Sequence, residues 1–231
     1  MQLSVRDVAR FLGVSQKTVY RWIQKEQIPG YRIGDQYRFN RAELLEWATQ
    51  RRIPLRPDLS SEPDATEGPR PRLIDALRAG GIQYRIGGED KASVLWAVVE
   101  NLRLPDEVDR EFLYSVLLAR ESLGSTGIGD GIAIPHMRNP VLLHLGQPSI
   151  SVSFLEHPVD FGAMDGKPVH TLFTLVSPTV SVHLHLLSCL AFALRNAEFR
   201  ATILGQGPRE EIFAAAEAAV HGLSSEAEAG A

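Results

Sequence analysis

The chain has 231 residues, which is enough for one large domain or two modest ones. Its 44% hydrophobic and 23% charged residues are ordinary for a globular protein, and no apolar run approaches the length of a membrane span. We therefore expect no membrane insertion and a cytoplasmic location. The single cysteine, Cys189, excludes an internal disulfide and a multi-cysteine metal site, and we expect neither a metal nor a cofactor.

Charge is distributed unevenly along the chain. Residues 1–56 contain eleven Lys and Arg residues against five acidic residues, a balance of +6, which leaves −10 for the remainder of a chain at −4. A small basic unit joined to a larger acidic unit predicts two domains with different partners. The partner of the basic domain should be anionic. Residues 53–71 include five prolines and almost no apolar residues, which is typical of a linker. We expect domains over 1–52 and 72–222 and a disordered tail over 223–231.

The basic unit has the pattern of a small helical domain. Ser4 can cap a first helix, Gly13 ends it, and Ser15 can cap a second helix, which gives the spacing of a helix-turn-helix. Two short extended runs follow, and Asn40 can cap a third helix. The outward face of the second helix and the hairpin carry side chains suited to base edges and phosphates: Gln16, Lys17, Thr18, Tyr20, Arg21, Arg32 and Arg38.

The stretch from Leu3 to Trp47 closely resembles the excisionase-type, winged branch of the mercury-resistance regulator superfamily. The segments that carry the resemblance are Ser4–Ala9, Gly13–Ser15, Thr18–Trp22, Ile28–Pro29 and Tyr37–Phe39. It implies a winged helix-turn-helix that binds double-stranded DNA. Two alternatives to DNA binding stay open for the charged face: a merely solvated surface and a protein-docking surface.

From Leu73 onward, strand and helix patterns alternate, which predicts an α/β layer structure. The expected strands are 82–86, 132–134, 149–155 and 171–177, and the expected helices are 91–102, 106–120 and 181–196, with further helical pattern over 197–220.

A glycine-rich stretch ends in a histidine. Gly124, Ser125, Thr126, Gly127, Gly129 and Gly131 allow sharp turns and close backbone approach to a ligand. Pro135 restricts Ile134 to extended conformations, so His136 is held at the end of a strand-like segment. An imidazole beside free backbone N–H groups suits chemistry on an anion. The alternative, on spacing alone, is a flexible loop with an incidental histidine.

The string from Arg120 through His136 resembles the active-site segment of enzyme IIA of the phosphoenolpyruvate-dependent sugar phosphotransferase system, of the fructose/mannitol and nitrogen-regulatory type. The resemblance extends over Leu73–Val220 and implies a mixed central sheet flanked by helices. It also implies that His136 carries a phosphoryl group, that Arg120 stabilises the phosphate and that His183 is a second active-site histidine. Met137 and Arg138 stand where the family usually has glycine and lysine.

Two residue patterns near this site have simpler interpretations. His183 and His185 are two positions apart on a predicted helix and therefore face different sides, so only one should reach the site, and they make a weak metal pair. Asp160 and Asp165 flank a turn, and turn hydrogen bonding explains both.

The combined expectation is a DNA-binding transcription regulator. Its His136 would receive a phosphoryl group from a histidine-containing phosphocarrier protein, so it would be a phosphocarrier rather than a turnover enzyme. Two alternatives stay open: a phosphocarrier for sugar uptake with an accessory N-terminal module, and a non-phosphorylated sensor or scaffold. A monomeric helix-turn-helix offers few base contacts, so we expect a homodimer or a second DNA site. Because salt screens distant charges, strong regulation by phosphate requires direct contact at the active-site face, either with the basic module or between two subunits.

Overall fold

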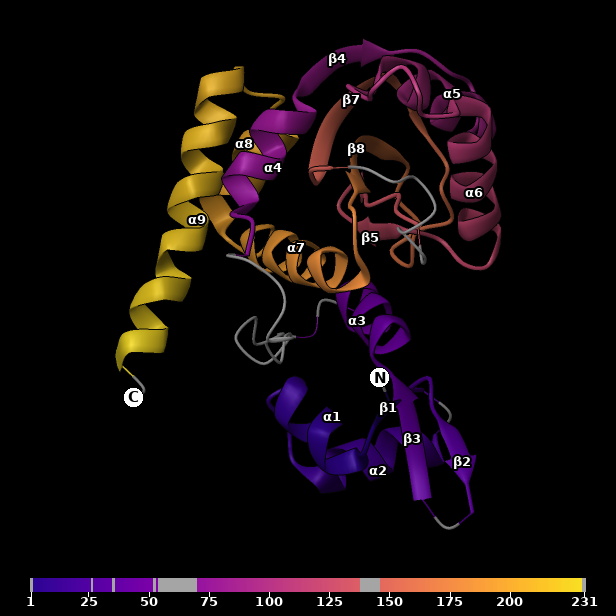
Figure 1. Cartoon of the computed structure of the whole chain (residues 1–231), viewed down its shortest axis with the longest axis vertical. Helices are drawn as coiled ribbons and strands as arrows, with labels where there is room; N and C mark the ends of the chain where they lie inside the picture. Colours follow the sequence, from indigo (N-terminus) through magenta and orange to yellow (C-terminus); the bar gives the residue numbers. More distant parts are fainter. Residues whose placement is uncertain are drawn as a thin grey trace.

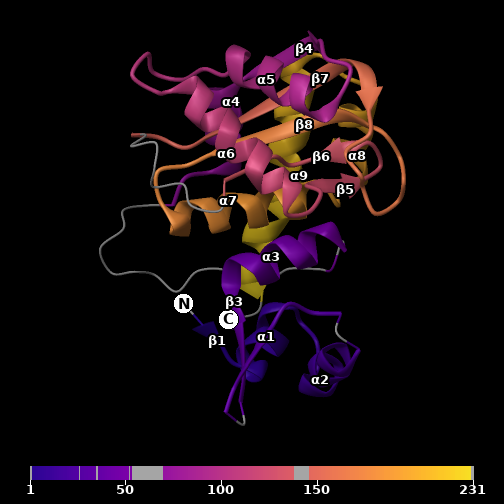
Figure 2. The same cartoon turned by 90° about the vertical axis from the view of Figure 1, so that its right-hand side faces the viewer.

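A computed structural model describes residues 2–25, 27–34, 36–51, 53, 70–137 and 146–229. Most of the predicted linker, together with Arg138, lies outside these residues. A small N-terminal domain and a larger C-terminal domain meet at one helix, α3 (Arg41–Gln50), which lies between them in both views (Figures 1 and 2).

The N-terminal domain is a winged helix-turn-helix. Its elements are β1 (Gln2–Leu3), α1 (Val5–Phe11), α2 (Gln16–Gln24), β2 (Tyr31–Ile33), β3 (Gln36–Asn40) and α3. Ser4 and Asp7 form a capping box at α1, and the side chains of Ser15 and Asn40 cap α2 and α3. The predicted caps and hairpin are therefore present. The sequence analysis did not anticipate β1, which adds a third strand beside β3.

The C-terminal domain is built on a five-stranded mixed sheet of order β4-β7-β8-β6-β5, as the fold class predicted. The strands are β4 (Ile82–Ile86), β5 (Gly127–Gly129), β6 (Ile132–Ala133), β7 (Ser149–Val159) and β8 (Val169–Val176). β7 runs antiparallel to β8, whereas β6 runs parallel to β8 and β4 parallel to β7.

Helices cover both faces of this sheet (Figure 1). α5 (Lys91–Asn101) and α6 (Arg110–Ser122) contribute to a hydrophobic cluster on one face. On the other face lie α4 (Leu73–Gly80), α7 (Val180–Ala193), α8 (Ala197–Leu204) and α9 (Arg209–Ala229). That second cluster continues without interruption into the core of the N-terminal domain, so the two domains share buried apolar surface.

Several elements differ from the sequence analysis, for example β7, which extends to Val159, and α7, which ends at Ala193. α6 begins at Arg110 and not at residue 106, because Asp109 accepts the Phe112 amide as the helix cap, and residues 105–108 form a turn. The glycine-rich stretch contains the short strand β5. The tail expected to be disordered continues α9 as far as Ala229, since its Ala and Glu residues are strong helix formers.

Candidate active site

The backbone fixes His136 at the end of a strand. Pro135 continues β6, and the chain pairs with β8 through a bridge between His136 and Leu175. The ring is 4% exposed, and its Nδ1 lies 2.7 Å from the carbonyl oxygen of Ile134. A carbonyl can only accept, so Nδ1 carries a proton and donates it. Nε2 is therefore the ring nitrogen left to react or to bind a partner.

Arg120 reaches the same site from the last turn of α6. Its guanidinium is buried, and Nη1 donates to the carbonyl oxygen of Gly124 at 2.9 Å. The neighbouring Glu121 accepts the Thr126 amide with both carboxylate oxygens and pairs with Lys91 at 3.2 Å. These two consecutive residues thus hold the start of the glycine-rich stretch in place.

His183 lies against His136, and His185 does not. The ring centroids of His136 and His183 are 5.3 Å apart. The His185 ring is instead near the Pro71 carbonyl oxygen, at 3.2 Å, and the Cys189 thiol. The two histidines therefore face different sides of α7, as their spacing predicts. Burial, together with the neighbouring His136, lowers the pKa of His183 to about 3, so this ring is neutral.

Three amides of the glycine-rich stretch are bonded within the loop itself. The amide of Gly124 donates to the Glu121 carbonyl oxygen, that of Thr126 to the Glu121 carboxylate and that of Gly127 to the Ser125 hydroxyl. Gly129 and Gly131 have positive φ and form the turn of the β5–β6 hairpin, where a Cβ on Gly131 would collide with His170. These residues shape the site through backbone conformation rather than through free donors.

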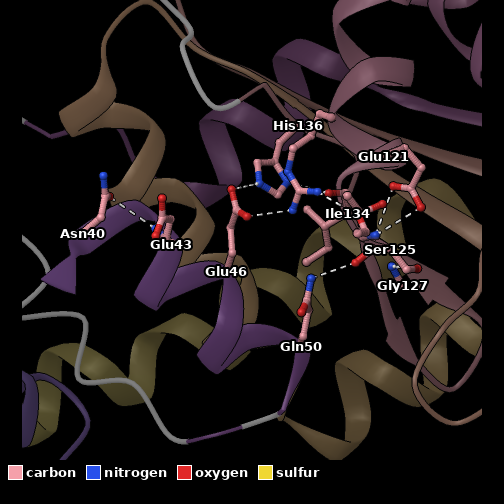
Figure 3. Close-up of polar contacts among 12 residues, drawn as sticks. Asn40, Glu43, Glu46, Gln50, Glu121, Ser125, Gly127, Ile134 and His136 are labelled. Atoms are coloured by element: carbon pink, nitrogen blue, oxygen red, sulfur yellow. Dashed lines mark hydrogen bonds and ion pairs between the residues drawn. The ribbon is translucent and has the colours of Figure 1, made fainter. Parts of the chain in front are cut away.

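Glu46 of the N-terminal domain completes the cluster (Figure 3). One carboxylate oxygen of this α3 residue lies 3.2 Å from Nε2 of His136, and the other accepts Nη2 of Arg120 at 2.8 Å. One turn further along α3, Gln50 donates to the Ser125 carbonyl oxygen at 2.8 Å. Direct contact between the active-site face and the basic module is therefore present.

The contact with Glu46 uses the ring nitrogen that Ile134 leaves open. Nδ1 of His136 donates to the Ile134 carbonyl oxygen, so Nε2 faces the Glu46 carboxylate. Arg120 binds the second oxygen of the same carboxylate, so one acid of α3 meets both a cation and the imidazole.

Residues predicted to contact DNA gather at the far end of the molecule from this site. Gln16, Lys17, Tyr20 and Arg21 are exposed on α2 and Thr18 is half-buried, while the hairpin carries exposed Arg32 and half-buried Arg38. Both α2 and the β2–β3 hairpin point away from the C-terminal domain (Figures 1 and 2). Docking of the two domains therefore leaves this surface open.

The sequence analysis missed Glu46, Gln50 and Glu121. No sequence signal marks Glu46: residues 44–49 are all buried in the structure, whereas a helix of a small domain with one core needs only one apolar face. Glu46 and Gln50 are four residues apart and share the second face of α3.

Cys189 is buried, and burial raises the pKa of its thiol to about 11, in keeping with a core position. The carboxylates of Asp160 and Asp165 accept turn amides, as predicted.

Two further features concern the described ranges only. No single helix there is long and apolar enough to span a membrane, although α7 and α8, which meet at 90°, pass that length and composition test as a bent pair. In the same ranges, no group of three or more His, Cys, Asp or Glu side chains is placed to hold a metal ion.

Comparisons with known proteins agree with this architecture. Residues 76–218 match the EIIA 2 family of the phosphoenolpyruvate-dependent sugar phosphotransferase system, and residues 3–52 match a helix-turn-helix domain family. The nitrogen regulatory protein of Pseudomonas aeruginosa is 38% identical over 146 residues, which are 62% of this chain and 92% of that protein. The fructose-specific EIIABC component of Bacillus subtilis is 31% identical over 136 residues, which are 58% of this chain and 21% of that protein.

A solved structure gives the same result. The nitrogen regulatory protein IIA-Ntr of Neisseria meningitidis superposes with a TM-score of 0.55 at 29% identity, covering 62% of this chain and 98% of that one. The chain therefore belongs to the EIIA 2 family of the phosphoenolpyruvate-dependent sugar phosphotransferase system and carries an N-terminal helix-turn-helix domain.

Proposed function

We propose that this protein is a DNA-binding transcription regulator whose His136 accepts a phosphoryl group from a histidine-containing phosphocarrier protein. The observation that carries the proposal is the fixed orientation of His136, whose Nδ1 is held by the Ile134 carbonyl while Nε2 points at Arg120 and Glu46. A ring held this way presents one defined nitrogen for attack on phosphorus. Nε2 is the nitrogen that becomes phosphorylated.

Arg120 and His183 are the groups that would stabilise the phosphoryl group. Transfer of a phosphoryl group depends mainly on positioning and on stabilisation of the negative oxygens. Arg120 supplies a buried, permanently charged fork, and one of its arms is already fixed by Gly124. His183 is neutral, so it can donate a hydrogen bond without adding a charge that would raise the desolvation cost of the site.

The N-terminal domain supports the regulatory half of the proposal. The exposed side chains of α2 are polar, aromatic or cationic, and this helix has the position of a recognition helix in a helix-turn-helix. The β2–β3 hairpin places Arg32 and Arg38 as a wing beside it. With few base contacts from one copy, a homodimer or a second site on the DNA would supply the remaining affinity.

The test is incubation of the full-length protein with phosphoenolpyruvate and the two general phosphocarriers of the system, followed by mass spectrometry. We expect the mass of one phosphoryl group, labile to acid and stable to base, located by peptide mapping on His136. His136→Ala should incorporate none. Phosphate on another residue, or label that survives in His136→Ala, would contradict the proposal.

One observation favours a second candidate, a sensor or scaffold that is not phosphorylated. His136 is buried and its reactive nitrogen is already paired with Glu46. A sensor or scaffold of this kind would incorporate no phosphate even in the Glu46→Ala variant. A phosphocarrier whose site Glu46 merely covers would incorporate phosphate in that variant.

A further inference from the structure

We infer that Glu46 occupies the place of the phosphoryl group, so that α3 of the DNA-binding domain and phosphate on His136 exclude each other. The inference rests on the proposed function and specifies how the two domains communicate. The docked form, with Glu46 in the site, is the unphosphorylated state. The phosphorylated state has α3 released from the C-terminal domain.

The contacts of Glu46 are those that a phosphoryl group on Nε2 would need. Its carboxylate lies against Nε2 of His136 and accepts from Arg120 with its second oxygen. A phosphoryl group bonded to Nε2 would fill the same space and would use the same arm of Arg120. Two anions cannot share this buried position, because both would compete for one cation away from water.

The charge pattern at the contact is opposite to that of the two domains. The N-terminal domain is basic and the C-terminal domain acidic overall, yet here an acid of the first meets Arg120 and His136 of the second. General attraction between the domains would not select this arrangement. This local reversal of charge sign shows that the contact is specific. It also means that negative charge added to His136 would repel Glu46 and the helix that carries it.

Apolar contacts and one further hydrogen bond hold α3 in register. α3 packs against α7 and β5, with Ile53, Ile128 and Val182 at the edge of the shared hydrophobic cluster. Gln50 donates to Ser125 one turn from Glu46. A cleft of about 370 Å³ opens between α3 and Leu123–Gly124, beside Arg120, so the interface is not sealed on that side. Such a surface can separate without unfolding either domain.

The docked form cannot react, for two reasons. His136 is almost fully buried, so the phosphohistidine of a donor protein cannot approach Nε2. The Glu46 carboxylate also occupies the position beside Nε2 that the phosphorus atom must reach. When α3 leaves, that position becomes open to the donor. The lone pair of Nε2 then forms the new P–N bond while the P–N bond of the donor breaks and its electron pair returns to the donor imidazole.

The surface predicted to bind DNA is not part of this contact. Tyr20 and Arg21 of α2 are exposed in the docked form, at the end of the molecule opposite the C-terminal domain (Figure 1). Docking therefore fixes the orientation of the DNA-binding domain rather than covering it. Phosphorylation acts by ending that fixed orientation. Because coupling between two sites is reciprocal, any partner that favours the docked form slows phosphorylation.

The first experiment compares phosphorylation rates of His136 in full-length protein, with purified phosphorylated phosphocarrier as the donor. We expect Glu46→Ala to be phosphorylated faster than wild type, within the about 5- to 150-fold range of coupling between sites. Glu43→Gln is the matched control, because it neutralises a carboxylate on the same helix that bonds to Tyr31 and not to His136. It should react at the wild-type rate.

The second experiment holds α3 in place. A short reducible thiol cross-linker joins cysteines introduced by Gln50→Cys and Ser125→Cys, positions that are in contact in the docked form. The cross-linked protein should lose phosphorylation, and reductant should restore it. Equal rates for wild type and Glu46→Ala, or full phosphorylation of the cross-linked protein, would overturn the inference while leaving the proposed function intact. Absence of phosphate from every variant, including Glu46→Ala, would instead reject the proposed function.

Discussion

Glu46 and His136 are 90 positions apart in the chain and belong to different domains, yet a carboxylate oxygen of one lies 3.2 Å from Nε2 of the other. Each residue is ordinary in its own domain. Together they bring the helix-turn-helix domain into contact with the histidine that we propose as the phosphoryl acceptor. The consequences can be measured on the site, on the stability of the fold and on DNA binding.

Replacing Arg120 by Lys should slow phosphoryl transfer. The guanidinium bonds Gly124 with one arm and an anion with the other, and a single ammonium cannot reproduce that fork. Loss of one charge-assisted hydrogen bond, about 1.5–3 kcal/mol, corresponds to roughly a tenfold slower rate or more. The comparison belongs in the Glu46→Ala background, since Arg120 also holds Glu46. Arg110→Lys, at the start of the same helix, is the control and should have no effect.

His183→Ala should impair transfer and His185→Ala should not. The first ring lies next to His136 at a tilt, whereas the second contacts Pro71 on the other side of α7. The loss of one neutral hydrogen bond to a phosphoryl oxygen is worth about 0.5–1.5 kcal/mol, or roughly two- to tenfold in rate. Single-turnover transfer from the phosphorylated carrier measures both variants. Equal losses would mean that His183 has no special relation to the phosphoryl group.

The free energy of unfolding should decrease as the pH falls below about 6.5. Burial lowers the pKa of His183 to about 3, whereas in the unfolded chain this ring has the ordinary value of 6.5. Between these values the unfolded state binds a proton that the folded state does not, so acid favours unfolding. Urea unfolding at pH 7.5, 6.5 and 5.5 gives the slope of the free energy of unfolding against pH. His183→Asn should make this slope shallower. An unchanged slope would show that His183 is not the buried neutral group responsible.

DNA binding by the full-length protein should depend steeply on salt. If Lys17, Arg21, Arg32 and Arg38 each neutralise one phosphate, the log–log slope is about −3.6, and alanine at both wing arginines should reduce it to about −1.8. Alanine at Arg72 and Arg103, exposed on the C-terminal domain, is the control and should leave the slope unchanged. Binding that ignores salt, or a slope that loss of both wing arginines leaves unchanged, would favour a protein-docking role for this face.

Local signals made the fold predictable. Ser4, Ser15 and Asn40 cap helices where the sequence placed them, because a cap depends only on neighbouring residues. The strands at 82–86 and 149–155 were evident from short buried apolar runs. The start of α6 was misplaced, since Asp106 and Asp109 are both good caps and only packing selects between them.

The site was predictable in part. His136, Arg120 and His183 could be proposed from the family pattern, and the structure brings them together. Glu46 could not be proposed, because the contact joins two domains across a linker and no local pattern records which face of α3 meets which surface. The hydrogen bonds of the glycine-rich stretch could not be predicted for a related reason: its amides find partners in Glu121 and Ser125, whose positions depend on the folded loop.

The central claim is that phosphate on His136 and docking of α3 exclude each other, and small-angle scattering of the full-length protein tests it most directly. Unmodified protein should have a radius of gyration of about 17 Å, the value typical of a compact chain of 231 residues. Stoichiometric phosphorylation, verified by mass, should increase it by several Å, about the scale of domain separation on a short tether. His136→Ala taken through the same reaction should not change. Identical scattering curves before and after verified phosphorylation of His136 would contradict the account.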